Sequence, residues 1–242
     1  MRTMIVTGAS SGIGRAVAEL ALERGWTVGL IARRAELLAE VAGGSDRACP
    51  LPCDVTDADA VDAAFARFAA RAGRLDCLFN NAGIFTPPGP IDEIAVADWE
   101  RAVSVNLTGM FLSARAAFRQ MRRQEPRGGR IVNNGSISAH VPRPGAATYT
   151  VTKHGITGLT RQIALDGRDF GIACGQIDIG NAATDMVAAT NARLAEQGET
   201  PQPTMDVAHA AGAVLHMAEL PPEANVLFQT VMATTMPYVG RG

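Results

Sequence analysis

The stretch MIVTGASSGIG, residues 4–14, is the most informative part of this 242-residue chain. It begins with a short apolar run typical of a buried strand, and helix-forming residues follow the stretch up to Arg24, before Gly25. Three glycines lie between them at positions 8, 12 and 14, a spacing that differs from G-x-G-x-x-G. Residues 4–24 therefore read as a strand, a glycine-rich turn and a helix.

A turn of this kind can bind phosphate. Glycine lets the backbone approach a ligand closely, and the free N–H groups and positive dipole end of the following helix attract a pyrophosphate. The hydroxyl groups of Ser10 and Ser11 can add hydrogen-bond donors. We predict a nucleotide site here, with a plain turn as the alternative.

The alternation of strand and helix patterns continues along the whole chain. We predict strands at residues 4–6, 27–32, 48–53, 75–79, from 130, 172–177 and 226–232, and helices at residues 12–24, 34–42, 57–72, 97–123, 147–170 and 205–218. Residues 185–203 are the least strand-like, and we expect them to move. The pattern predicts one α/β domain over residues 1–242, a doubly wound parallel sheet of about seven strands with helices on both faces. In such sheets, ligands bind beyond the carboxyl ends of the strands.

Composition excludes several classes of protein. The formal net charge of −2 lacks the basic excess of sequence-independent nucleic-acid binding, and 47% hydrophobic against 19% charged residues excludes a disordered chain. We find no apolar run long enough to span a membrane and no apolar signal stretch at the N-terminus, so we expect a cytoplasmic protein without a membrane partner. The four cysteines are expected to be reduced, and their spacing indicates no metal site.

The end of the second predicted strand is where a dinucleotide enzyme selects its cofactor. An acid at this place binds the ribose 2′-hydroxyl of NAD, whereas an arginine accommodates the 2′-phosphate of NADP. This chain has Ala32, Arg33 and Arg34 there. The pattern favours NADP(H) over NAD(H), and the alternative is two solvated arginines at the start of a helix.

A tyrosine and the chain's only lysine are placed together. Lys153 is the single lysine among 22 basic residues, and Tyr149 is one of two tyrosines. Because they are four residues apart on a predicted helix, both side chains lie on one face. A nearby ammonium group stabilises a phenolate, so we expect a lowered pKa for Tyr149 and a role in proton transfer. The alternative is a solvated lysine beside a buried tyrosine.

These motifs together resemble the short-chain dehydrogenase/reductase family, which has a Rossmann-type fold. The residues that carry the resemblance are Thr7-Gly8-x3-Gly12-x-Gly14, Asn80-Asn81-Ala82-Gly83, Asn106, Ser136 and Tyr149-x3-Lys153. Their order and spacing agree with the family over nearly the whole chain. The resemblance implies an enzyme that transfers hydride between NADPH and a ketone, or oxidises a secondary alcohol in reverse.

The resemblance also implies a role for each matching catalytic residue. Tyr149 would donate a proton to a ketone, and Lys153 would lower its pKa and bind the nicotinamide ribose. Ser136, thirteen residues before Tyr149, would orient the substrate oxygen, with Ser138 as a possible substitute. Asn106 would hold a water that links Lys153 to solvent.

Other family positions would bind the cofactor. Besides Ser10, Ser11, Arg33, Arg34, Tyr149 and Lys153, the resemblance implies cofactor contacts at Gly8, Gly12, Ile13, Gly14, Asp54, Val55, Asn81, Ala82, Gly83, Gly180 and Thr184. The chain departs from the family after the sixth strand, where Ile179-Gly180 replaces the usual Pro-Gly. It departs again after the last strand, where Met232-Ala233-Thr234-Thr235 replaces a glycine pair.

Alternatives remain at the levels of substrate and assembly. The chain could reduce 3-oxoacyl thioesters on an acyl-carrier protein, or keep the fold as a dinucleotide-sensing module without catalysis. His140 could face the substrate, although a hydrogen bond within its loop is favoured. The apolar faces of residues 99–121 and 147–165 exceed what one sheet face needs, so we expect a homotetramer or a homodimer.

Overall fold

Seven parallel strands form a single sheet in this computed structural model, which describes residues 2–196 and 198–239. The strands are β1 (Thr3–Thr7), β2 (Thr27–Ala32), β3 (Ala48–Pro52), β4 (Cys77–Asn80), β5 (Gly129–Asn134), β6 (Ile172–Gly180) and β7 (Phe228–Met232). Their order across the sheet is β3-β2-β1-β4-β5-β6-β7. The predicted doubly wound fold is therefore confirmed.

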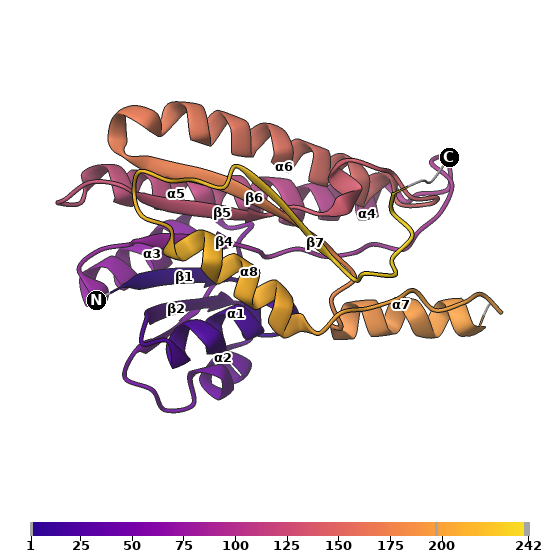
Figure 1. Cartoon of the computed structure of the whole chain (residues 1–242), viewed down its shortest axis with the longest axis horizontal. Helices are drawn as coiled ribbons and strands as arrows, with labels where there is room; N and C mark the ends of the chain where they lie inside the picture. Colours follow the sequence, from indigo (N-terminus) through magenta and orange to yellow (C-terminus); the bar gives the residue numbers. More distant parts are fainter. Residues whose placement is uncertain (1, 197, 240–242) are drawn as a thin grey trace.

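Helices cover both faces of the sheet (Figure 1). They are α1 (Gly12–Glu23), α2 (Ala35–Ala42), α3 (Ala58–Ala72), α4 (Val96–Val103), α5 (Met110–Arg123), α6 (Ala147–Asp166), α7 (Asp185–Glu196) and α8 (Val207–Glu219). Side chains of β1 alternate between two cores: Met4 and Val6 pack towards α1 and α8, and Ile5 packs towards α3 and α5. Asp57 caps α3, accepting hydrogen bonds from the backbone N–H groups of Asp59 and Ala60.

The helix predicted over residues 97–123 is wrong in one respect, because it is interrupted. A π-helical segment, Ser104–Gly109, separates α4 from α5. At Gly109 a Cβ atom would lie 2.9 Å from Cγ2 of Val55, so only glycine allows the helix to pass this close to the loop after β3. The segment contains Asn106, and short π-helical segments are frequent at functional sites.

Three further boundaries differ from the prediction. The helix expected to reach residue 170 ends at Asp166. At Gly167 the backbone passes so close to the carbonyl oxygen of Ile172 that a Cβ atom would lie 2.2 Å from it. Strand β6 extends to Gly180, and residues 185–196, for which no helix was predicted, form α7. The alanine-rich sequence of α7 favours a helix. None of the helices in the part of the chain that the structure describes is long and apolar enough to cross a membrane.

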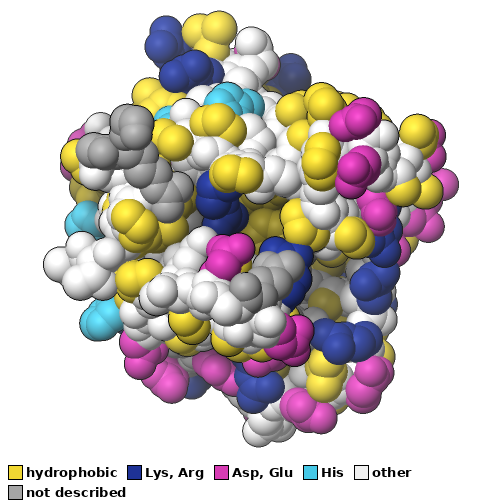
Figure 2. Space-filling view, turned by 90° about the vertical axis from the view of Figure 1, so that its right-hand side faces the viewer, with side chains coloured by type: hydrophobic (Ala, Val, Ile, Leu, Met, Phe, Trp, Pro, Cys, Tyr) yellow, Lys and Arg dark blue, Asp and Glu magenta, His cyan; other side chains and the backbone are white. Residues whose placement is uncertain are grey.

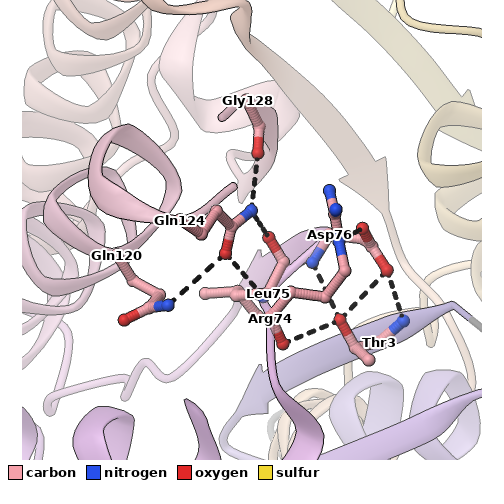
Figure 3. Close-up of polar contacts among 7 residues, drawn as sticks. All are labelled: Thr3, Arg74, Leu75, Asp76, Gln120, Gln124 and Gly128. Carbon is pink, nitrogen blue, oxygen red and sulfur yellow. Dashed lines mark hydrogen bonds and ion pairs between the residues drawn. The ribbon is translucent and has the colours of Figure 1, made fainter. Parts of the chain in front are cut away.

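A polar cluster holds the amino end of the central strands together (Figure 3). The buried side chain of Gln124 accepts a hydrogen bond from the Leu75 N–H group at 2.9 Å, and donates to the carbonyl oxygens of Leu75 and Gly128. Beside it, Asp76 accepts hydrogen bonds from the backbone and hydroxyl groups of Thr3. The cluster satisfies backbone groups between β4 and α5 that secondary structure leaves unpaired.

Replacing Gln124 should therefore destabilise the fold. Gln124→Met keeps the side-chain volume but leaves buried backbone groups of Leu75 unpaired, so we expect the free energy of unfolding to fall by about 2–4 kcal/mol. Urea denaturation followed by circular dichroism measures this change. Gln120→Met is the matched control, because Gln120 makes only a 3.4 Å contact with Gln124, and a loss of equal size there would contradict the assignment.

Candidate active site

The carboxyl ends of the strands border a cavity of about 520 Å³. It lies where the strand order reverses between β1 and β4, the place at which doubly wound sheets bind ligands. Figure 2 looks onto this end of the molecule and shows a hollow flanked by Lys and Arg side chains. The predicted site residues that line it are Gly8, Ser10, Ser11, Gly12, Ile13, Arg33, Arg34, Asp54, Val55, Asn81, Ala82, Gly83, Ser136, Tyr149, Lys153 and Thr184.

The glycine-rich turn forms one wall of the cavity and needs its glycines. Gly8 and Gly12 have positive φ angles of 69° and 54°, which side chains other than glycine rarely adopt. Gly14 does not line the cavity and has another use: a Cβ atom there would lie 2.3 Å from the carbonyl oxygen of Gly8. Gly14 thus lets α1 pack against the end of β1, which brings the helix N-terminus to the cavity.

Asn81 braces the sheet at the same place. Its side-chain amide donates to the carbonyl oxygen of Thr7 at 2.9 Å, and its amide oxygen accepts from Asn134 at 2.8 Å. The Thr7 hydroxyl in turn accepts from the backbone N–H groups of Asn81 and Ala82. Both polar atoms of the Asn81 side chain thus bind neighbouring strands, and in this way Asn81 shapes the cavity.

Two arginines lie at the end of β2, on the far side of the turn. Arg34 donates to the Ser10 hydroxyl at 3.4 Å, which links β2 to the glycine-rich turn. Arg33 lies near Asp54, where hydrogen bonds from Thr56 lower the pKa of the carboxyl group and the Arg33 charge contributes to the same effect. This end of the cavity therefore combines backbone N–H groups with guanidinium groups, a combination suited to phosphate.

Asn106 is fully buried in the π-helical segment and does not line the cavity. Its side chain accepts from the Ile84 N–H group at 2.7 Å and donates to the Ile84 carbonyl oxygen at 2.9 Å. These two bonds attach α4 and α5 to the segment after β4. The side chain therefore has a structural use that the sequence did not predict.

Tyr149 and Lys153 lie on one face of α6, as their spacing predicted. The Lys153 ammonium lies 5.4 Å from the centroid of the Tyr149 ring and donates to the carbonyl oxygen of Asn134 at 2.7 Å. The Tyr149 ring also packs against Phe85, with 4.2 Å between ring centroids. Lys153 is almost completely buried, so the alternative of a solvated lysine is wrong.

The pKa values in this site follow from burial. Burial raises the pKa of Tyr149, and the Asp178 carboxylate acts in the same direction, while Ser136 and Arg143 oppose it. The sequence predicted a lowered pKa, and the structure differs because removal of the phenol from water outweighs the nearby positive charges. Burial also lowers the pKa of Lys153 to about 8, against the opposing influence of Asp178.

Ser136 is the serine that faces the cavity. Its hydroxyl accepts a hydrogen bond from the Ser138 N–H group at 3.1 Å, in the short turn after β5. Ser138 is fully buried and is not part of the cavity wall. The geometry therefore favours Ser136 over Ser138 for contact with a ligand.

The segment after β6 brings Thr184 to the cavity but turns Gly180 away. A Cβ atom on Gly180 would lie 2.8 Å from Cβ of Met232, so this glycine packs against β7 and does not line the cavity. Thr184 lies near Gly12, where an added Cβ atom would be 3.3 Å from its methyl group. Asn181 between them has a positive φ of 50°, which directs the chain back towards the glycine-rich turn.

Sequence reasoning missed several charged residues in and beside this site: Arg101, Arg143 and Asp185 line the cavity, and Asp178 is buried next to Ser136. Arg143 lines the cavity from the loop before α6, and no signal in its irregular loop distinguishes it from other arginines. Asp178 is fully buried on β6, and here a signal existed: an acid inside the apolar run Ile177–Ile179 requires a partner. That partner is His140, whose Nε2 lies 2.7 Å from Oδ2 of Asp178, so His140 makes a hydrogen bond within the protein.

Comparison with known proteins gives the family. The model of the short chain dehydrogenase family matches residues 2–195. A 3beta-hydroxysteroid dehydrogenase of Mediterraneibacter gnavus is 36% identical over 83% of this chain and 75% of its own length. A cis-4-hydroxycyclohexanecarboxylate dehydrogenase of Sinomonas cyclohexanicum is 40% identical (77% and 76%), and a 3-oxoacyl-[acyl-carrier-protein] reductase of Vibrio harveyi is 34% identical (91% and 90%). The chain belongs to the short-chain dehydrogenase/reductase family of oxidoreductases, which act on alcohols or ketones with a nicotinamide dinucleotide.

Proposed function

We propose that this protein transfers hydride between NADPH and a ketone, or in reverse oxidises a secondary alcohol. One observation carries the proposal: Ser136, Tyr149 and Lys153 meet in the same cavity as the glycine-rich turn and the arginines after β2. The cavity thus offers proton-transfer groups together with groups that suit a pyrophosphate and a 2′-phosphate. A Cβ atom on Gly12 would lie 3.3 Å from the methyl group of Thr184 and would narrow the cavity. The glycine therefore leaves room for a dinucleotide, which supports the proposal.

Each side chain has a defined task in this proposal. A bound nicotinamide supplies or accepts the hydride. Tyr149 gives its phenolic proton to the carbonyl oxygen, and Ser136 holds that oxygen by a hydrogen bond. Lys153 is held by Asn134 beside the tyrosine and supplies a positive charge to the reacting end of the cavity. The Asn106 side chain bonds both backbone groups of Ile84, so in this proposal its backbone carbonyl binds the water that links Lys153 to solvent.

The substrate end combines apolar side chains with one arginine. Ile84, Phe85 and Met186 line the cavity there, and Arg143 contributes a positive charge near Tyr149. The Sinomonas relative is named for a hydroxy acid and the gnavus relative for a hydroxysteroid. We therefore propose an apolar ketone or alcohol as the substrate class, with a carboxylate accepted beside Arg143.

Two other functions remain candidates. The Vibrio relative is named for a 3-oxoacyl thioester on an acyl-carrier protein, and an assay of acyl-carrier thioesters against free ketones separates the two substrates. A dinucleotide-sensing module without catalysis is less well supported. It would have no use for a buried lysine beside a cavity-facing tyrosine.

Tyr149→Phe should remove nearly all turnover. The variant keeps the ring and loses the proton donor, so kcat should fall at least about 100-fold, while NADPH affinity stays within a few-fold of the wild type. Absorbance at the nicotinamide band measures turnover, and fluorescence titration measures NADPH binding. Tyr238→Phe is the matched control for the other tyrosine, and wild-type turnover in Tyr149→Phe would overturn the proposal.

Arg33→Asp should change cofactor preference. The substitution replaces a candidate 2′-phosphate ligand with an acid that can bind a ribose hydroxyl, so the ratio of kcat/KM for NADPH to that for NADH should fall by at least about tenfold. Arg67→Asp makes the same charge change on an exposed site of α3. An unchanged ratio in Arg33→Asp would refute the role of Arg33.

We also propose that α5 and α6 form an interface between copies of the chain, in a homodimer or homotetramer. Phe111 and Leu165 are about half exposed on these helices, and a second cavity of about 940 Å³ lies between them. Helix α5 carries Arg115, Arg119, Arg122 and Arg123, and the first two are paired within the chain through contacts with Asp62. The exposed apolar surface that remains is typical of a subunit contact.

Phe111→Glu should disrupt this interface. Burying a new carboxylate at the contact is unfavourable, so the variant should sediment as a smaller species than the wild type. Ile91→Glu, at an exposed apolar residue outside the face, is the control. Sedimentation velocity tests both, and a monomeric wild type would rule the interface out.

A further inference from the structure

Asp178 is a buried carboxylate beside the reacting groups, and the roles proposed for Ser136, Tyr149 and Lys153 do not include it. It lies on β6 and is fully inaccessible to solvent. An isolated ionised carboxylate is costly to bury unless it is paired and hydrogen-bonded. The structure therefore has to compensate this charge, and how it does so connects Asp178 to the catalytic residues.

Both oxygens of Asp178 are engaged. Oδ1 accepts hydrogen bonds from the backbone N–H group of Ser136 at 2.8 Å and from Nε2 of Gln176 at 2.7 Å. A Cβ atom on Gly135 would lie 2.1 Å from this oxygen, so a glycine is needed beside Ser136 for the carboxylate to fit. Asp178 thus fixes the backbone from which the cavity-facing serine projects.

The second oxygen of Asp178, Oδ2, contacts a residue that is partly exposed to solvent. Oδ2 lies 2.7 Å from Nε2 of His140, whose side chain is 39% exposed. His140 therefore reaches solvent while Asp178 stays buried. A cationic side chain at position 140 compensates the buried carboxylate, whereas an uncharged side chain leaves its negative charge in the site.

Few other charges face this carboxylate in the described part of the chain. From α6 come Tyr149 and Lys153, and the pKa of each is raised by Asp178. Arg143, in the loop before α6, acts on Tyr149 in the opposite direction. On β7 the residue paired with Asp178 is Thr230, which is uncharged. Tyr149 and Lys153 are thus the groups that respond to a change at Asp178.

We propose that Asp178 is a positioning residue which fixes Ser136 and, with His140, sets the charge beside Tyr149 so that the phenol stays in its proton-donating form. The inference rests on the proposed function, in which Tyr149 donates to a carbonyl. The pair does not change the equilibrium of the reaction. It widens the pH range in which reduction is fast and moves alcohol oxidation, which needs the phenolate, to higher pH.

The scarcity of tyrosine allows a direct test. In a Tyr238→Phe background, Tyr149 is the only tyrosine, so the ultraviolet absorbance of tyrosinate reports its ionisation without substrate or cofactor. Three variants are compared in this background with circular dichroism at each pH. Asp178→Asn removes the charge and keeps the shape. His140→Arg compensates the charge permanently, and His140→Gln keeps a hydrogen-bond donor without charge.

Asp178→Asn and His140→Arg should each lower the pH at which Tyr149 ionises by about half a unit or more. His140→Gln should ionise at the wild-type pH or above it. Kinetic assays should show the same order in the pH midpoint of alcohol oxidation. The proposal is overturned if both Asp178→Asn and His140→Arg titrate like the wild type, or if His140→Gln shifts downwards with them.

The second charged variant keeps the test decisive if Asp178→Asn does not fold, because His140→Arg leaves Asp178 in place. The titration also separates this inference from the proposed function. If the protein reduces no ketone yet the variants shift the ionisation as stated, the charge effect stands and the proposed function fails. If turnover is found but the ionisation does not shift, the proposed function stands and the inference about Asp178 fails.

Discussion

The close contact between α1 and the end of β1 is the constraint on which the site depends. A side chain at position 14 would collide with the Gly8 carbonyl group, so glycine is needed there. Close by, the Thr7 hydroxyl accepts a hydrogen bond from the N–H group of Asn81, directly after β4. Together they fix β1, α1 and β4 around the place where the strand order reverses. The cavity, the free N–H groups of α1 and the approach of β5 through Asn134 all follow from this junction.

Within the cavity formed by this junction, the low access of solvent determines which charge states of Tyr149 and Lys153 are favoured. A phenol and an ammonium group that would be ordinary in water are both held in their uncharged forms more strongly, since burial raises the pKa of Tyr149 and lowers that of Lys153. Arg143 and Asp178 have opposite effects on the pKa of the Tyr149 phenol: Arg143 lowers it and Asp178 raises it. A change of charge at either residue therefore alters which form of Tyr149 is favoured.

The fold could be predicted from the sequence because its signals are local. Short apolar runs, glycine at positive φ and the Asp57 cap act over a few residues, and successive β-α-β units indicate a parallel sheet. The shared helix face of Tyr149 and Lys153 was also predictable from spacing, and the family resemblance pointed to Ser136, which lines the same cavity. Asn106 shows the limit, because its side chain is taken up by a partner 22 residues away, Ile84. The pairing of Asp178 with His140 joins residues 38 positions apart, and no periodicity indicates such a pair.

The contrast between the buried arginine and the buried lysine explains why this arginine-rich chain contains a lysine at all. Arg130 is buried among several acceptors: it donates to Asn225 and to the carbonyl oxygens of Leu220, Pro221 and Ala224. A guanidinium requires such a set, because it has five donors and stays charged. The described partner of the Lys153 ammonium is one carbonyl oxygen, that of Asn134. The lysine ammonium is compact, and its pKa of about 8 lets it lose a proton, so one acceptor is sufficient at this site. A guanidinium would stay charged and would have unpaired donors beside Tyr149.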